Sequence, residues 1–106
     1  MSNDYDKVEQ LELPVSATLI YTSPADKVTI IKHMRFISSS NSAKTYTIWD
    51  GGTDDVNLIQ NDTTIVKGGS DTHDVNIFLP PNATLYAKAS AANSITATFY
   101  GIVKPQ

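Results

Sequence analysis

The stretch LIYTSPADKVTIIKHMRFISSSNSAKTYTIWD, residues 19–50, decides the fold class of this chain. Two of its runs, residues 28–38 and 44–50, are rich in β-branched and aromatic residues, which favour strands. The segment before the first run is typical of a turn, because Pro24 presets a backbone φ angle and Asp26 can bond its own backbone. The stretch therefore predicts a strand, a turn, a long strand, a polar turn and another strand.

The run over residues 28–38 does not alternate polar and apolar side chains throughout its length. In a regular strand Ile30 would share one face with Lys32, while Ile31 would share the other face with His33. Two explanations remain open: both faces are covered for part of the length, or a β-bulge near Ile31 and Lys32 shifts the register. Either explanation keeps the run as one long strand.

The remainder of the chain also carries strand signals, with runs of β-forming or alternating residues bounded by Gly, Pro, Asn and Asp clusters. These additional runs are residues 15–22, 56–60, 63–67, 74–79, 83–89 and 94–103. No stretch has a helical period. The pattern predicts an all-β fold of about eight strands, an antiparallel β-sandwich with jelly-roll-like connectivity, for which immunoglobulin-like connectivity is the alternative.

The chain has 106 residues, a length that fits one domain with its own apolar core. Residues 15–104 contain all the predicted strands and are expected to form this single domain. Residues 1–14 show no clean period. They predict an N-terminal arm, which is either frayed or loosely docked, as termini usually are, or lies on a neighbouring molecule.

The composition narrows the function classes. The formal net charge is −3 and the eight basic residues are scattered, which argues against a nucleic-acid binder. Without cysteine there is no disulfide framework or thiolate metal site. The first residues are polar, and no apolar run approaches the roughly 18 residues that a membrane span needs, so we expect synthesis in the cytoplasm and no membrane partner. Only 18% of residues are charged, against about 25% in typical domains, and uncharged faces suit packing against other subunits.

Aromatic and threonine side chains are the candidate interaction residues. Alternation along its strand places Trp49 outward, where an indole could stack on a sugar ring or anchor a subunit interface. A register shifted by one residue would instead make Trp49 part of the core. Tyr86 and Tyr100, with Thr96 and Thr98, are expected to form a flat polar interaction face, for which a solvated sheet surface is the alternative.

Catalytic and metal chemistry are not expected. Two acidic clusters contain metal-ligand residue types, but neither has a recognised ligand spacing, so we predict no metal site and no cofactor. The clusters are Asp71, His73 and Asp74, and Asp50, Asp54 and Asp55. The two histidines are far apart in the sequence, and neither a Gly-x-Ser-x-Gly motif nor a Gly-rich phosphate loop is present. The chain is therefore not expected to be an enzyme.

Several segments together resemble a pattern common in small virion proteins of tailed bacteriophages. They are YTSPADKVTIIKHMRFI (21–37), TYTIW (45–49), NIFLP (76–80), ATLYAKAS (83–90) and ITATFYGIV (95–103). The resemblance covers about residues 15–103. It departs from the pattern at Ala25-Asp26, where Ala-Gly is usual, and at residues 80–83, where a Pro-Gly-Asp type of turn is usual.

The resemblance implies a small all-β structural protein of a phage particle, either a head decoration or cement protein or a neck or tail component. Such a protein acts by oligomeric packing, with a homotrimer expected, and its partners are phage capsid or tail proteins. Its expected location is the virion, after synthesis in the host cytoplasm. The alternative is a carbohydrate- or host-receptor-binding module of a phage tail that uses Trp49 and neighbouring tyrosines.

Overall fold

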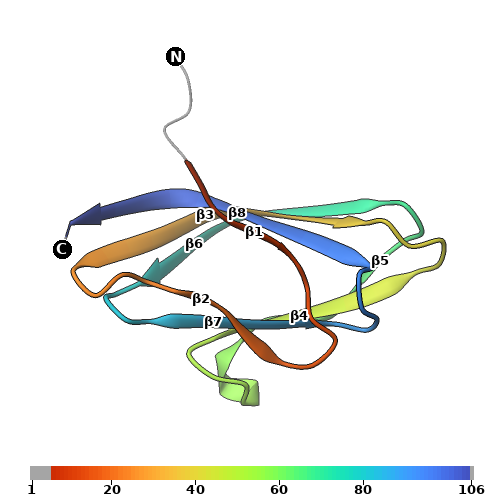
Figure 1. The fold of residues 1–106 in the computed structure, drawn as a ribbon, viewed down its shortest axis with the longest axis horizontal. Coiled ribbons are helices and arrows are strands. Elements are labelled where there is room, and N and C mark those ends of the chain that lie inside the picture. Colours follow the sequence, from red (N-terminus) through yellow and green to blue (C-terminus); the bar gives the residue numbers. More distant parts are fainter. Residues whose placement is uncertain (1–5, 106) are drawn as a thin grey trace.

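The structure, a computed structural model, describes residues 6–105 and consists of two antiparallel four-stranded sheets packed face to face (Figure 1). This confirms the predicted all-β sandwich of eight strands. A short 3₁₀ helix, η1 (Asp55–Asn57), precedes the fifth strand. The strands are β1 (Asp6–Glu12), β2 (Thr18–Thr22), β3 (Lys27–Ser38), β4 (Lys44–Asp50), β5 (Leu58–Ile65), β6 (Ser70–Leu79), β7 (Thr84–Ala89) and β8 (Ile95–Pro105). No helix in this part of the chain is long and apolar enough to cross a membrane.

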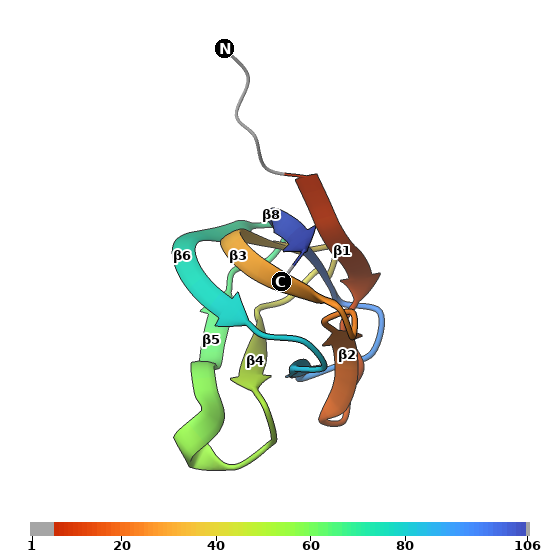
Figure 2. The same cartoon turned by 90° about the vertical axis from the view of Figure 1, so that its left-hand side faces the viewer.

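The strand order is that of a jelly roll. The upper sheet of Figures 1 and 2 has the order β1-β8-β3-β6, and the lower sheet has the order β2-β7-β4-β5. The strands pair from the two ends of the chain inward: β1 with β8, β2 with β7, β3 with β6 and β4 with β5. This nested pairing is a single long antiparallel ribbon wound into two sheets. Consecutive strands lie in different sheets except β4 and β5, so the connectivity is not immunoglobulin-like.

The N-terminal segment is part of the sandwich rather than an arm. Residues 6–12 form β1, which pairs along β8 at the edge of the upper sheet, and Leu13 is buried in the core. The backbone N–H of Leu13 donates to the carbonyl of Ile95 at 2.8 Å. The prediction of an arm over residues 1–14 is therefore wrong for residues 6–14, and its residues 1–5 lie outside the described part of the chain. Strand β1 could not be predicted because it is an edge strand whose bulge breaks the alternation of polar and apolar residues.

One strand, β5, replaces the two short strands expected at residues 56–60 and 63–67. Asn61 and Asp62 separate these two runs and are residue types that favour a turn, and Asp62 does have a positive φ of 45°. The strand nevertheless continues, because the kink is absorbed as an irregularity in its pairing with β4. The strand count of eight was therefore right through two compensating errors, one strand missed and one divided.

Of the two explanations for the broken alternation near Ile31 and Lys32, the β-bulge is the one present in β3. Ile31 pairs with Gly101 and His33 pairs with Tyr100, so Lys32 is the extra residue. The shift lets Ile31 point into the core while His33 points to the outer face. A β-carbon on Gly101 would overlap the carbonyl oxygen of Ile30, so this close approach of β3 and β8 requires glycine.

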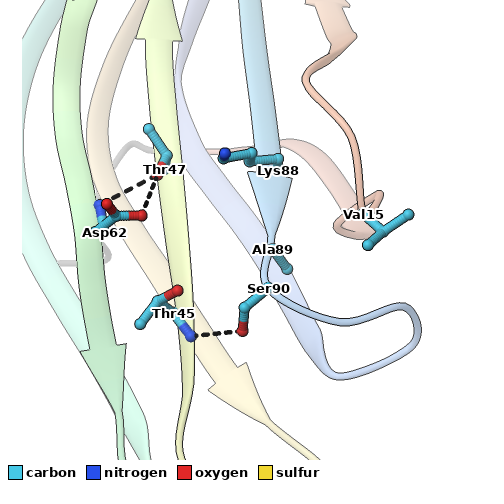
Figure 3. A pocket seen from close by; sticks show the side chains of 7 residues that line it. All are labelled: Val15, Thr45, Thr47, Asp62, Lys88, Ala89 and Ser90. Carbon is cyan, nitrogen blue, oxygen red and sulfur yellow. Dashed lines mark hydrogen bonds between the residues drawn. The ribbon is translucent and has the colours of Figure 1, made fainter.

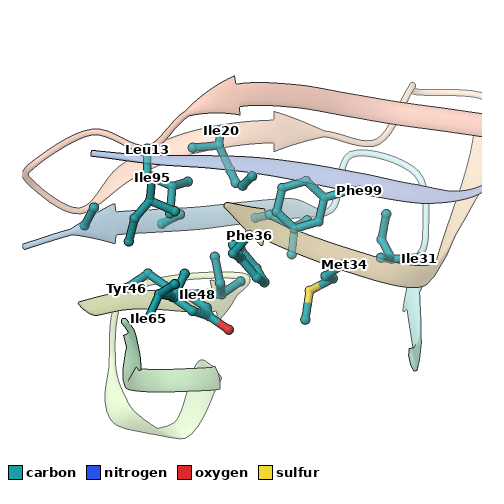
Figure 4. Packing of buried hydrophobic residues seen from close by; sticks show 14 of the residues in the cluster. Leu13, Ile20, Ile31, Met34, Phe36, Tyr46, Ile48, Ile65, Ile95 and Phe99 are labelled. Carbon is teal, nitrogen blue, oxygen red and sulfur yellow. The ribbon is translucent and has the colours of Figure 1, made fainter. Parts of the chain in front are cut away.

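The core lies between the sheets (Figure 4). Strands β3, β4, β7 and β8 each contribute two or more of its buried residues, whereas β2, β5 and β6 contribute one each. Phe36 stacks on Tyr46 with ring centroids 4.0 Å apart and meets Phe99 edge to face at 6.1 Å. Such aromatic pairs add to the free energy gained by burial of their area. The sandwich thus presents two outer faces, one for each sheet, on a rigid apolar interior.

Candidate functional site

The five predicted interaction residues lie on both outer faces of the sandwich. Thr96, Thr98 and Tyr100 are on β8, in the upper sheet, whereas Trp49 and Tyr86 are on β4 and β7, in the lower sheet. The expected single face of Tyr86, Tyr100 and the two threonines therefore does not form, because the core separates the two groups. Each outer face has to be considered separately.

On the upper face, Tyr100 is surrounded by side chains from β3. The guanidinium of Arg35 lies 5.9 Å from the Tyr100 ring centre, and its Nη2 donates to the tyrosine hydroxyl at 3.3 Å. The ring of His33 is 6.0 Å from that of Tyr100. Arg35 Nε is buried and has no hydrogen-bond partner within residues 6–105. Tyr100 is thus half-buried and fixed by its neighbours instead of being free to stack on a ligand.

Other polar side chains of the upper face also bond one another. Gln10 on β1 donates to the hydroxyl of Thr98 at 3.0 Å, and Thr98 is only 2% exposed. His33 Nδ1 is 2.8 Å from the carboxylate of Asp74 on β6. Thr96, a half-buried neighbour in the same row of β8, faces outward beside Ile37. The centre of this face is therefore a sheet surface with few free hydrogen-bonding groups.

An apolar strip crosses the upper face beside the bulge. It consists of Ile102 on β8, Ile30 on β3 and Phe78 on β6, which are paired across the three strands. Ile30 and Ile102 are half-buried, while Phe78 is 58% exposed on an edge strand. This strip could not be predicted from the sequence, because the bulge decides which residues of β3 point outward.

On the lower face, a row of apolar and aromatic residues crosses all four strands. Leu19 pairs with Tyr86, Tyr86 with Trp49, and Trp49 with Leu58. Trp49 faces outward, as alternation predicted, yet only 7% of it is exposed. A large side chain that is covered in this way contributes to packing, and it cannot offer a free ring face for stacking. Tyr86 is half-buried and Leu19 is 45% exposed, so they are the accessible members of the row.

Next to this row, the lower face is hollowed (Figure 3). The hollow has a volume of about 220 Å³ and mostly polar walls. It is lined by Thr45, Thr47, Asp62, Lys88 and Ser90, with Val15 and Ala89 as the apolar members. None of the five polar residues was singled out from the sequence, because β4, β5 and β7 bring them together only in the folded sheet.

The acidic residues do not converge on a cation. Asp71 and His73 point into the sandwich, whereas Asp74, the next outward residue of β6, bonds His33 on the opposite side. Burial raises the pKa of Asp50 above its ordinary value. Within residues 6–105, no group of three His, Asp or Glu side chains is arranged to hold a metal ion.

A polar cluster closes one side of the sandwich, where β6 of the upper sheet meets β4 and β5 of the lower sheet. The hydroxyl of Tyr46 donates to Asp71 at 2.7 Å, and His73 Nε2 lies 2.8 Å from the same carboxylate. The amide nitrogen of Gln60 lies 2.7 Å from that imidazole nitrogen. We call Tyr46, Gln60, Asp71 and His73 the seam cluster.

The seam cluster shifts the ionisation of two of its members. Burial raises the pKa of Tyr46 well above its ordinary value, and the hydrogen bond to Asp71 adds to the effect. Burial also opposes ionisation of Asp71, but the hydrogen bonds from Tyr46 and His73 outweigh it and hold the pKa of Asp71 below its usual range. The cluster therefore fastens the two sheets together most firmly with Tyr46 neutral and Asp71 ionised.

The sequence matches no known family model, and no curated protein shows significant similarity to it. The chemistry of the two outer faces is therefore inferred from their own residues. The upper face offers an apolar strip beside polar groups that bond one another, and the lower face offers a polar hollow.

Proposed function

We propose that this protein is a non-enzymatic structural component of a bacteriophage particle, such as a capsid decoration or cement protein, that acts through oligomeric packing. The apolar strip of Ile30, Phe78 and Ile102 is the observation that carries the proposal. Exposed apolar surface on an edge strand favours contact with another protein. The expected assembly is a homotrimer, with phage capsid or tail proteins as further partners.

The surroundings of the strip support a packing role. Thr98, Tyr100 and Arg35 have partners within the upper face, so covering them leaves few broken bonds to water. Jelly rolls are among the architectures of viral capsid domains, although a fold alone does not assign a function. The resemblance over residues 15–103 adds the phage particle as the setting.

The arrangement of the histidines supports a non-enzymatic role. His33 is bonded to Asp74 on the outer face, and His73 belongs to the seam cluster inside the sandwich. Neither imidazole is hydrogen-bonded to a serine or threonine hydroxyl anywhere in residues 6–105. A nucleophile activated by histidine is thus not part of the proposal.

The mass in solution tests the packing role. We expect light scattering over a dilution series to give a fixed multiple of 11.5 kDa down to sub-micromolar concentrations. Phe78→Asp places a charge on the most exposed residue of the strip and should reduce the mass to that of one chain. Val66→Asp, at a side chain 67% exposed outside the strip, is the matched control and should keep the assembly. A wild-type monomer at every concentration, or an unchanged mass for Phe78→Asp, would contradict the proposal.

A further inference from the structure

The hollow on the lower face contains a carboxylate that is held in place before any ligand arrives. Thr47 is its floor, and its hydroxyl accepts the backbone N–H of Asp62 at 3.1 Å and donates to the Asp62 carboxylate at 3.4 Å. Asp62 has a left-handed φ of 45°, which these two bonds help to stabilise. The carboxylate is exposed and keeps most of its acceptor capacity for another molecule.

Lys88 supplies the opposite charge from the neighbouring strand. It pairs with Thr47 across β7 and β4, and Figure 3 shows its side-chain nitrogen on the side of Thr47. Within residues 6–105, Lys88 has neither a hydrogen-bond acceptor nor an ion-pair partner, and it forms no ion pair with Asp62. A free donor and a fixed acceptor thus flank one threonine.

We propose that this hollow binds a neutral sugar unit, with Lys88 donating to one ring hydroxyl and Asp62 accepting from a neighbouring one. A hydroxyl both donates and accepts, so vicinal hydroxyls satisfy the two groups together. A ligand that carries charge of a single sign would be attracted by one group and repelled by the other. This function is additional to the packing role, and it lies on the opposite face of the sandwich.

The size and remaining walls of the hollow fit the same ligand. Its volume of about 220 Å³ is below the roughly 300–1,000 Å³ of pockets for drug-sized molecules, and it suits a single monosaccharide unit. The backbone N–H of Thr45 donates to the hydroxyl of Ser90 at 3.0 Å. This hydroxyl can still donate its own proton to a ligand. Val15 and Ala89 offer apolar contact to the C–H groups of a ring.

The test is an amide NMR titration of the ¹⁵N-labelled full chain with the methyl glycosides of glucose, galactose, mannose and N-acetylglucosamine. We expect at least one of these sugars to shift the amide signals of Thr47, Asp62 and Lys88, with a Kd of order 1 mM. Glucuronate and glucosamine, which carry a negative and a positive charge, should bind more weakly than the best neutral sugar.

Two variants assign the binding to the named groups. Lys88→Met and Asp62→Asn should each weaken binding about tenfold. The first removes a charged donor, and the second replaces a charged acceptor by a neutral and weaker one. Asparagine tolerates the left-handed conformation, so Asp62→Asn preserves the fold. Lys67→Gln and Asp54→Asn change exposed residues outside the hollow and serve as matched controls with unaltered binding.

Three results would overturn this assignment. One is the absence of shifts at the three amides with about 50 mM of every neutral sugar, which would place each Kd far above 1 mM. Another is equal binding by the wild type, Lys88→Met and Asp62→Asn. The third is tighter binding of glucuronate or glucosamine than of any neutral sugar. The solution mass is expected to be the same for all of these variants, so failure here is distinguishable from failure of the packing role.

Discussion

The two outer faces of this sandwich have similar architecture but differ in whether their polar side chains bond one another. On the upper face, Arg35 bonds Tyr100, His33 bonds Asp74, and the buried hydroxyl of Thr98 is satisfied by a glutamine. On the lower face, Lys88 has no partner within the described residues, and the carboxylate of Asp62 has a single long bond. The faces also differ in their apolar residues, which form an open strip above and a largely covered row below.

This difference separates two kinds of surface. Polar groups that bond one another lose little when another protein excludes water, so the upper face suits packing. Groups held in place without partners gain new bonds when a ligand arrives, so the lower face suits recognition. The five residues proposed from the sequence are divided between these two surfaces, because β8 lies in one sheet and β4 and β7 lie in the other.

Gly101→Ala should lower the free energy of unfolding more than any other substitution considered, because it disrupts the bulge that turns His33 and Arg35 outward. The new methyl group would overlap the backbone of β3, and neither strand can move without breaking its ladder. We expect a loss of about 4 kcal/mol or more in the free energy of unfolding, or no folded protein. Urea unfolding followed by circular dichroism measures it.

Gly52→Ala is the control for that substitution. Its methyl group would meet only the flexible end of the Asn57 side chain, in a loop beside the lower sheet. We expect a change within about 1 kcal/mol. Equal and small effects of both substitutions would show that the bulge does not set the upper face.

Trp49→Ala tests whether the row on the lower face is covered packing or an open stacking surface. Since Trp49 is 7% exposed, its removal should lower the free energy of unfolding by about 3 kcal/mol. Trp49 is the only tryptophan of the chain, so its fluorescence reports directly on its surroundings. We expect a blue-shifted emission that acrylamide quenches weakly. Strong quenching together with unchanged stability would instead identify an open stacking platform.

A substitution in the seam cluster should change the free energy of unfolding by a smaller amount that depends on pH, and it should leave both outer faces intact. The pKa of Tyr46 is raised in the folded state, so its contribution to stability is complete below about pH 10 and is lost as the pH rises further. Tyr46→Phe should cost about 1 kcal/mol at neutral pH through lost hydrogen bonds. The difference between wild type and variant should then shrink toward about pH 11.

Urea unfolding of wild type and Tyr46→Phe at several pH values measures this difference. Tyr21→Phe is the matched control, since among residues 6–105 its hydroxyl bonds only Thr29 and lies outside the seam cluster. A constant difference between wild type and Tyr46→Phe across the alkaline range would contradict the role given to the seam cluster.

Much of the fold could be predicted because the relevant signals are local. Alternation and turn residues identified most strands, and the broken alternation around Lys32 indicated either a bulge or a strand covered on both faces, of which the structure has the bulge. The edge strand β1 escaped because one of its faces is solvated and its own bulge breaks the pattern. The split of β5 followed from reading Asp62 as a turn, although its left-handed conformation is held within a strand by Thr47.

The candidate sites were harder to predict, because they depend on cross-strand register. Alternation placed Trp49 on the outer face correctly, but its burial depends on neighbours in other strands. Phe78 and Ile30 become neighbours only through the pairing of β3 with β6. Lys88 and Asp62 are distant in sequence, and only the order β7-β4-β5 brings them around Thr47.

The most direct test of the division between the faces compares the solution masses of two variants. Phe78→Asp places a charge on the upper apolar strip, and Leu19→Asp places the same charge on the accessible end of the lower row, where the side chain is 45% exposed. Light scattering should find Phe78→Asp reduced to a single chain and Leu19→Asp still assembled. An assembled Phe78→Asp with a monomeric Leu19→Asp would show that packing uses the lower face, and would contradict the account.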